Sequence, residues 1–438
     1  MGCRDASVVC AQSVKVKVFF CHKMEVSEQD SEKIRGALGL PADAKLSVET
    51  KNQLPPHKRG ANEMENPSRP QFEIHASPEA AQFFYSNNLS LLLSAYKSNL
   101  VFAFGATDDH KLSCYYSQFF HPLALGLSQR EDCLEVWIAS NGGLLRCVDA
   151  GEKYNEADEH SGGGGNFTAT LVPRQAHLIG KQDVHGIYPL SPQSPFFVST
   201  KFSALCQLDI TKPDVNVNVV WKPSFITELR GEDRCHFNDV CWVDGLAKYA
   251  SCICESDAHD GWRDHRQGGG VIIDIMNDKI VARNLSMPHS PRWYKKQLWV
   301  LNSGSGHLGT INLENGTFEP KVFIPGFLRG LQFHGRFAIV GSSLDRHERR
   351  FQDLELGKNL ETKKTTPVCG FFFIDLASFS IAQKVEIKGN IHEIYDILLV
   401  PTRRVRLINA SDEDSACVKV VDNSARYRKK DDENEEEK

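Results

Sequence analysis

The sequence predicts an all-β fold, a six-bladed β-propeller, from a repeated pattern, its spacing and the arrangement of its two ends. Six segments resemble one another, and each carries a large polar residue at the same place. These residues are His121, His185, His236, His289, Arg329 and Tyr395. A second apolar run follows most of them, and a third run usually closes on an acid or amide. A unit of three or four short strands recurring every ~40–60 residues is typical of a propeller.

The two ends of the repeated region predict how the propeller closes. Three strands are expected before His121, over Leu89–Tyr96, Leu100–Gly105 and Leu112–Gln118. Only one strand, Ile394–Val400, is expected at the last repeat. One C-terminal strand and three N-terminal strands would complete the sixth blade and remove an exposed sheet edge.

The flanks of the repeats define three regions. Residues 1–76 do not fit the pattern and are interpreted as an N-terminal extension and linker. Residues 77–410 contain every repeat and are expected to fold alone as the propeller. Residues 411–438 are dominated by charged side chains, which predicts a disordered tail.

Composition excludes several classes of protein. A net charge of −5 is not the basic balance expected of a nucleic-acid-binding protein. The sequence also contains no run of ~18 apolar residues that could span a membrane. The 13 cysteines form no C-x-x-C pair, which favours a reducing compartment and a cytoplasmic location. Gly2 and Cys3 resemble acylation sites, but Ala6 stands where myristoylation requires Ser or Thr, so an ordinary N-terminus is favoured.

Two long insertions are expected to cover one face of the propeller. They fall between the second and third strands of their repeats, at residues 255–270 and 343–367. These loops lie on the same face as the starts of the first strands. Trp262 and Arg263 are therefore expected over the channel mouth as ligand-binding residues of a lid. The alternative is that both loops are insertions without a functional role.

The repeated polar residues predict a site on the propeller axis. Histidines from different strands would bind a divalent transition metal such as iron or zinc. The candidate ligands are His185, His236, His289 and His121. Glu393 and Asp396 would act as general base or orient a histidine. Arg329 and Tyr395 complete the candidate catalytic set, with Asn238 as a ligand-binding residue.

Two other interpretations of these residues remain open. Each histidine is explained equally by a hydrogen-bonded channel residue in contact with water. A site without metal is the other possibility, in which His, Arg and Tyr side chains bind a carboxylate, phosphate or sulfate. Arg329 would then supply the bidentate contact.

Several segments resemble a widespread family of conserved hypothetical proteins described only by a domain of unknown function. They include Arg234–Asn238, Leu285–Trp293, Leu298–Gly304, Pro325–Gly330 and Glu393–Asp396. The resemblance covers about 77–401 and implies a propeller-like fold without a known reaction. It implies that the following residues match the family's motif positions: His185, His236, Asn238, His289, Arg292, Arg329, Glu393 and Asp396. Arg292 joins the candidate ligand-binding residues on this ground.

The sequence thus supports two classes of function. The first is a metal-dependent enzyme that acts on a small polar molecule in the central channel. The second is a non-catalytic binding module for an anionic ligand or a protein partner.

Overall fold

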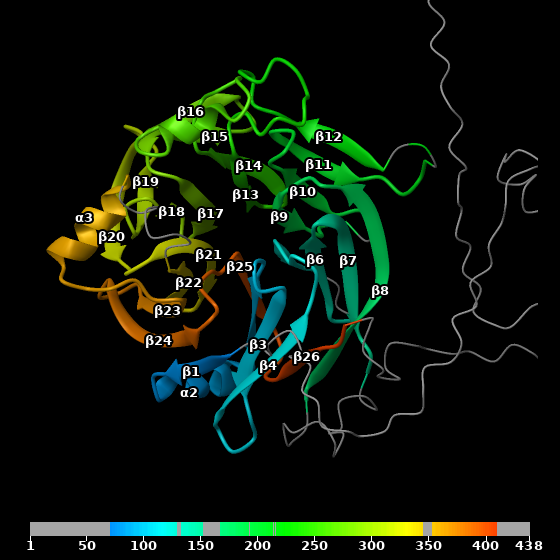
Figure 1. Cartoon of the computed structure of the whole chain (residues 1–438), viewed down its shortest axis with the longest axis vertical. Helices are drawn as coiled ribbons and strands as arrows, with labels where there is room; N and C mark the ends of the chain where they lie inside the picture. The colour runs from blue at the N-terminus through cyan, green and yellow to red at the C-terminus, as the bar shows by residue number, and fades with distance from the viewer. Residues whose placement is uncertain are drawn as a thin grey trace, which may run out of the picture. The chain divides into compact units, whose positions relative to one another are not determined.

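The computed structural model describes residues 71–409, except 129–132, 152–166, 192, 213, 215 and 345–352. The chain divides into two units, Met1–Pro67 and Ser68–Lys438, and the described residues all belong to the second. The predicted extension up to residue 70, the acylation motif and the charged tail lie outside the described residues. The described strands form six sheets around one axis (Figure 1), which confirms the six-bladed propeller.

Three blades have four antiparallel strands each. One contains β9 (Val184–Tyr188), β10 (Phe196–Ser199), β11 (Ala204–Leu208) and β12 (Val217–Trp221). The next contains β13 (Phe237–Val243), β14 (Leu246–Cys252), β15 (Gly270–Asp274) and β16 (Lys279–Leu285). The third contains β17 (Pro288–Tyr294), β18 (Gln297–Asn302), β19 (His307–Asn312) and β20 (Thr317–Phe323).

The closing blade combines both ends of the propeller, as the sequence predicted. Its strands, from the axis outward, are β25 (Asp396–Val400), β2 (Ser90–Ala95), β3 (Leu100–Ala106) and β4 (Leu112–Gln118). The antiparallel register of β25 on β2 runs from Ser94 opposite Asp396 to Ser90 opposite Val400.

The chain ends also extend the two blades on either side of the closing blade. One consists of β5 (Leu125–Leu127), β6 (Glu135–Ser140), β7 (Gly142–Asp149), β8 (Ala169–Gly180) and the parallel outer strand β26 (Val405–Leu407). The other consists of β21 (Phe327–His334), β22 (Phe337–Ser343), β23 (Gly370–Asp375), β24 (Ser380–Gly389) and the outer strand β1 (Phe72–Ala76). Strand β1 precedes Ser77, the predicted start of the propeller.

Near-continuous apolar runs form the inner strands because both faces of each blade are covered by neighbouring blades. On β3, Phe102 and Phe104 belong to one buried cluster, while Val101 and Ala103 belong to another. Successive side chains of a strand point to opposite faces, so β3 packs on two neighbours at once. The helices are α2 (Glu79–Asn87), α3 (Glu355–Thr362) and the 3₁₀ turn η2 (Gly261–His265).

A recurring hydrogen bond fixes the register of the innermost strands. A hydroxyl near the end of one blade's second strand donates to a carbonyl in, or just before, the next blade's first strand. The pairs are Ser94 to Leu123 (2.6 Å), Thr200 to Phe237 (2.6 Å), Ser303 to Leu328 (2.7 Å) and Ser343 to Ile394 (3.2 Å). The residue after each acceptor occupies what we call the axial position of its blade.

The remaining two carbonyls are bound by axial side chains themselves. Tyr395 donates its hydroxyl to Val184 at 3.3 Å, and Asn238 donates its amide to Pro288 at 2.7 Å. The axial residues are therefore Ala124, His185, Asn238, His289, Arg329 and Tyr395. The repeated sequence pattern predicts His121 and His236 at two of these positions, where the structure has Ala124 and Asn238.

Gly330, which follows the axial Arg329, allows β25 to approach β21 closely. Its φ is +73°, and an added Cβ would lie 2.6 Å from the backbone nitrogen of Ile397. We expect Gly330→Ala to destabilise the protein by about 2–5 kcal/mol, from the left-handed backbone and the clash together. Gly335→Ala is the matched control, because Gly335 has φ +58° and open space around it. Equal urea midpoints for the two variants would contradict this prediction.

Candidate functional site

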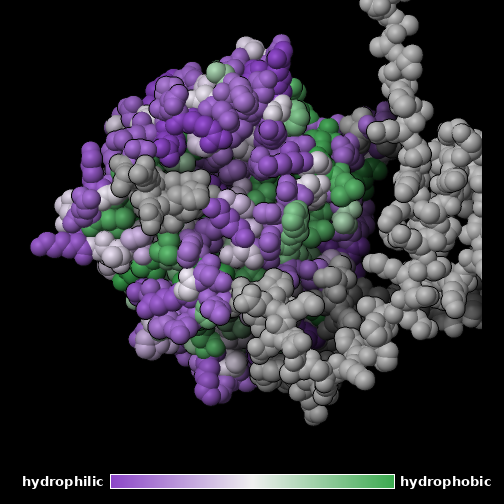
Figure 2. All heavy atoms as spheres, viewed as in Figure 1, coloured by the Kyte–Doolittle hydropathy of each residue, from purple (hydrophilic) through white to green (hydrophobic). Residues whose placement is uncertain are grey.

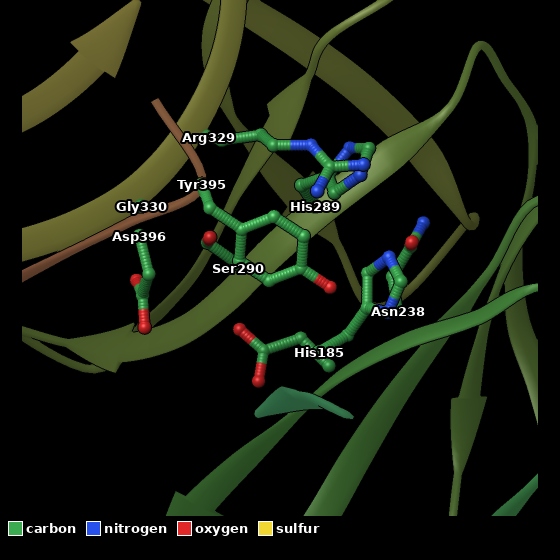
Figure 3. Close-up of a pocket in the computed structure, with 9 residues that line it drawn as sticks. His185, Asn238, His289, Ser290, Arg329, Gly330, Tyr395 and Asp396 are labelled. Carbon is green, nitrogen blue, oxygen red and sulfur yellow. The ribbon is translucent and has the colours of Figure 1, made fainter. Parts of the chain in front are cut away.

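A small cavity lies on the axis at the N-terminal ends of five innermost strands. Its lining residues are His185, Asn238, Asp239, His289, Ser290, Arg329, Gly330, Tyr395 and Asp396. Figure 3 shows the side chains of Arg329, Tyr395, His185 and Asn238 around one common space. The cavity measures about 10 Å³, on a scale where one water needs about 10–15 Å³. The site as it stands therefore has room for about one water molecule.

Two axial histidines are held in the same tautomer by the same local motif. Nδ1 of His185 lies 2.8 Å from the Asp183 carbonyl, and Nδ1 of His289 lies 2.8 Å from the Met287 carbonyl. Since a carbonyl only accepts, each Nδ1 carries the proton and each Nε2 carries the lone pair. Both carbonyls belong to residues with positive φ two positions earlier, Asp183 at 49° and Met287 at 51°. A left-handed turn before the strand thus orients each imidazole.

A backbone carbonyl also orients the Asn238 amide. Its nitrogen donates to the Pro288 carbonyl, which has no hydrogen to give, so its Oδ1 must point elsewhere. Asn238 is 1% exposed, and Oδ1 has no hydrogen-bond partner within the described residues. A buried amide oxygen without a donor costs about 1–3 kcal/mol. Asn238 therefore presents an unsatisfied acceptor at the cavity wall.

Arg329 brings a positive charge into this buried site. It is 7% exposed, and its Cζ lies 4.8 Å from the centre of the Tyr395 ring. The Tyr395 ring in turn lies 5.2 Å from that of His185. The pKa of His185 is held well below its usual range, mainly by burial and then by the nearby His236 and Arg329. His185 is therefore a neutral imidazole next to a guanidinium.

The depressed pKa of His185 predicts a pH dependence of stability. The unfolded chain gains a proton on His185 below about pH 6.5, whereas the folded chain does not, so acid favours unfolding. Its stabilising contribution is complete above that pH and is lost as pH falls toward the folded pKa. We expect wild type to lose roughly 1 kcal/mol of stability relative to His185→Gln between pH 8 and 5.5. Urea unfolding across this range tests it, with the exposed His259→Gln as control, and parallel profiles would contradict it.

The two carboxylates at the cavity are already engaged by the protein. Asp239 accepts from Arg292 at 2.8 Å and from the Tyr188 hydroxyl. Asp396 accepts from the backbone N–H groups of Leu125 at 3.0 Å and Ile397 at 2.9 Å. Burial raises the pKa of Asp396 to about 7, and the nearby Asp239 acts in the same direction.

His236 lies outside the cavity lining but touches one of its members. Its ring centre lies 4.9 Å from that of His185, and its Nδ1 is 2.8 Å from Asp233 Oδ2. The Trp262 ring packs against it at 4.2 Å. The loop between β14 and β15 therefore covers the side of the site on which His185 lies.

The two predicted insertions meet in one apolar cluster, which we call the cap. Its buried members are Ile253, Cys254, Trp262, Met287, Leu354, Leu356 and Leu360. Arg266 of the first insertion lies 3.2 Å from Asp353 of the second. Arg263 is exposed on the outer side of the cap, with its Cζ 4.6 Å from the Trp262 ring. Polar residues cover most of the face seen in Figure 2, with smaller apolar groups near α3.

The other candidate residues are placed away from the cavity. Glu393 is buried and accepts from the Lys97 backbone N–H at 2.8 Å. Arg292 lies outside the cavity lining and forms an ion pair with Asp239. His121 packs near Tyr96, with ring centres 6.2 Å apart. None of these residues is among those that line the cavity.

Sequence reasoning missed three lining residues, Asp239, Ser290 and Gly330. One signal was available for Asp239, because Asn238-Asp-Val240 and Tyr395-Asp-Ile397 share an axial residue, an acid and a branched residue in order. In both, the carboxylate accepts from the next backbone N–H at 2.9 Å. No comparable pattern marks Ser290.

Among the described residues, no group of three or more His, Cys, Asp or Glu side chains is placed to hold a metal ion. The described part of the chain also contains no helix long and apolar enough to cross a membrane. The predicted metal site therefore stays a prediction.

Comparison with known proteins places the chain in a family. A model described as Domain of unknown function (DUF4915) matches residues 78–408. The chain belongs to this family. The match covers every described strand except β1 and confirms the resemblance drawn from the motifs. No curated protein matches the sequence.

Solved structures resemble the chain only at the level of the fold. A chain of a nidogen/laminin complex has 12% identity and a TM-score of 0.43, over 72% of this chain and 99% of that one. A protein of unknown function from Bacteroides caccae has 8% identity and a TM-score of 0.42, over 72% and 99%. Virginiamycin B lyase from Staphylococcus aureus has 10% identity and a TM-score of 0.34, over 73% and 100%. Likenesses this distant do not bear on the function of the chain.

Proposed function

We propose that the axial cavity is the functional site and that it binds a small molecule bearing an anionic group, with Arg329 as the counter-ion. The observation that carries the proposal is a buried guanidinium at a cavity whose wall also holds the amide oxygen of Asn238, which is unsatisfied among the described residues. His185 is neutral, Asp239 is bound to Arg292, and Asp396 has a pKa near neutrality. A guanidinium in a buried site binds an anionic group strongly, because the low local dielectric strengthens a charge-assisted hydrogen bond.

A carboxylate suits this site better than a larger anion. The guanidinium is planar and offers parallel donors that match a carboxylate in two hydrogen bonds. The small cavity disfavours the tetrahedral volume of phosphate or sulfate. Even a carboxylate requires some widening, and the cap lies on the His185 side of the site. In this proposal the cap is the part that moves when the ligand enters.

The test is binding to the purified, chelator-treated full chain at constant ionic strength. Acetate, glycolate, phosphate and sulfate are compared with chloride by calorimetry and thermal shift. We expect saturable binding of a small carboxylate with a rise in melting temperature. If none of the four anions binds, the proposal fails.

A metal-dependent enzyme acting on a small polar molecule is the second candidate, and one observation favours it. In His185, His236 and His289, Nδ1 faces an oxygen, which leaves Nε2 as the nitrogen with the lone pair. Histidines that ligate metals are commonly held this way by their second nitrogen. The chemistry supplied by bound iron or zinc would be Lewis-acid activation of substrate or water.

Metal analysis of the untreated protein separates the two candidates. Stoichiometric iron or zinc that is lost in His185→Ala and retained in the exposed His259→Ala supports the enzyme. Protein that contains no metal after incubation with iron or zinc, yet binds a carboxylate, supports the anion site.

A further inference from the structure

The outermost strand of one blade, β12, presents an unprotected edge. It reads Val217-Asn-Val-Val-Trp221 and pairs with β11 on one side, and no described strand pairs with its other side. It contains no charged residue and no proline, and Val219 and Val220 are 43% and 49% exposed. The unpaired N–H and C=O groups of such an edge can pair with another chain, so proteins commonly protect edges with charges, proline or a covering segment.

The other outer edges carry these protections. Strand β4 is uncharged, but the C-terminal segment covers it, since Arg404 Nε donates to Ser113 Oγ at 3.0 Å and the Asn409 amide donates to the Gln118 carbonyl. Strand β26 is buried along its whole length. The remaining outer strands have protecting residues of their own: Lys279 and Arg283 on β16, Glu319, Pro320 and Lys321 on β20, and Glu73 on β1. Among the described strands, β12 is therefore the one outer edge that is neither charged nor covered.

A groove of about 300 Å³ opens just past the C-terminal end of β12. Phe225, from the connection that leaves β12, lines it together with Ile273 of β15 and Ile280 of β16, and all three pack in the apolar cluster between this blade and the next. The rim carries charges of both signs, including an ion pair of Arg283 with Glu255 at 2.7 Å. The groove thus suits an apolar side chain rather than a charged one.

We propose that β12 and this groove bind an extended peptide segment of a partner protein, which adds to β12 as a fifth strand and places an apolar side chain in the groove. The propeller already accommodates a fifth strand in two blades, where β1 pairs with β24 and β26 pairs with β8. Main-chain hydrogen bonds give such strand addition its affinity, and side-chain pockets give it selectivity. The surface lies on the outer rim of the propeller (Figure 1), so it is independent of the axial cavity.

A peptide fits this surface better than a second copy of the chain. The edge of a five-residue strand is about 17 Å long and about 10 Å deep, so it offers roughly 170 Å² to a partner. Stable interfaces bury about 800 Å² on each partner. A flexible peptide can continue past β12 into the groove, whereas a copy paired through β12 alone leaves the groove empty. We expect the segment to be uncharged, with β-branched or aromatic side chains at alternate positions.

Selection of random peptides displayed on phage tests the proposal on the full chain. We expect the enriched peptides to alternate β-branched or aromatic residues with small polar ones. Val219→Lys puts a charge on the edge and should weaken binding of a synthetic enriched peptide at least about tenfold, as for a central interface residue. Leu313→Lys is the matched control and should leave binding unchanged, because Leu313 is 41% exposed and lies in the β19–β20 turn.

N-methylation of the same peptide tests strand addition on the wild-type chain, whatever the stability of the variant. A strand turns alternate N–H groups toward its neighbour, so methylating one alternate set should abolish binding and methylating the other should leave most of it.

Three results would overturn the proposal. Equal effects of the two methylated sets exclude strand addition. Enrichment of no peptide, or equal binding to wild type and Val219→Lys, excludes the surface. A wild-type dimer that is lost in Val219→Lys assigns the edge to a second copy instead of a peptide.

Discussion

Replacing Arg329 by Met is expected to weaken glycolate binding by about 100- to 1000-fold. Truncating one partner of a buried, hydrogen-bonded charge pair costs about 3–4 kcal/mol or more. Met keeps an apolar stem against the Tyr395 and Phe327 rings that now flank the guanidinium at 4.8 and 6.0 Å. Arg329→Lys should be intermediate, because it keeps the charge and loses the planar pair of donors. Calorimetric titration with glycolate measures all three proteins.

Arg329→Met also has an expected effect that needs no ligand. The guanidinium is one cause of the low pKa of His185, so its removal should raise that pKa toward the ordinary value. Titration of the imidazole by NMR measures the change. Arg336→Met serves as the control, since Arg336 is exposed and pairs with Asp375. Unchanged glycolate affinity together with an unchanged His185 titration would show that Arg329 does not act on this site.

The blades were predictable because their physical signal is local and repeated. Each inner strand is buried between two neighbours, so its apolar run survives in the sequence regardless of what the protein binds. The closing blade followed from counting strands at the two ends. Strands β1 and β26 were not predicted, because β1 (Phe72–Ala76) is largely exposed and β26 is buried but only three residues long.

The axial register could not be read from the sequence in two blades. His236 was aligned with His185 and His289, yet its φ of 48° matches Asp183 and Met287, the turn residues before those strands. A histidine in a left-handed turn and a histidine at the axis look alike in a sequence. What distinguishes them is the hydroxyl-to-carbonyl bond from the neighbouring blade, such as Thr200 to Phe237, which joins residues 37 positions apart.

The chemistry of the site depends on contacts of the same kind. The sequence indicated which side chains gather at the axis, including Arg329 and Asn238. Whether each side chain offers a proton or a lone pair to the cavity depends on its hydrogen bond to a backbone carbonyl, as in the bond from the Asn238 amide to Pro288. A prediction of metal binding from histidines alone treats the two ring nitrogens of each histidine as equivalent. Their hydrogen-bond partners in the structure show which nitrogen carries the proton.

A chain that ends at Gly389 is expected to fail to fold as a monomer, because it lacks β25 and β26. Strand β25 is the innermost strand of the closing blade, and without it β2 exposes an unpaired edge toward the axis. The lost segment also removes apolar side chains that are at most 2% exposed, among them Ile394, Ile397, Val400, Val405 and Leu407. Each contributes about 1.5–3 kcal/mol by burial. Together they match the whole net stability of a typical domain, about 5–15 kcal/mol.

The matched control is a chain that ends at Ala410, which keeps every described strand and removes only the charged C-terminal segment. We expect it to elute as a monomer and to melt within about 2 °C of the full chain, because none of the described blades loses a strand. The shorter chain should be found in aggregates or bound to chaperones, since its open sheet edges pair with other chains. Size-exclusion chromatography and thermal unfolding compare the two. A monomeric, equally stable chain ending at Gly389 would mean that β25 does not close the propeller.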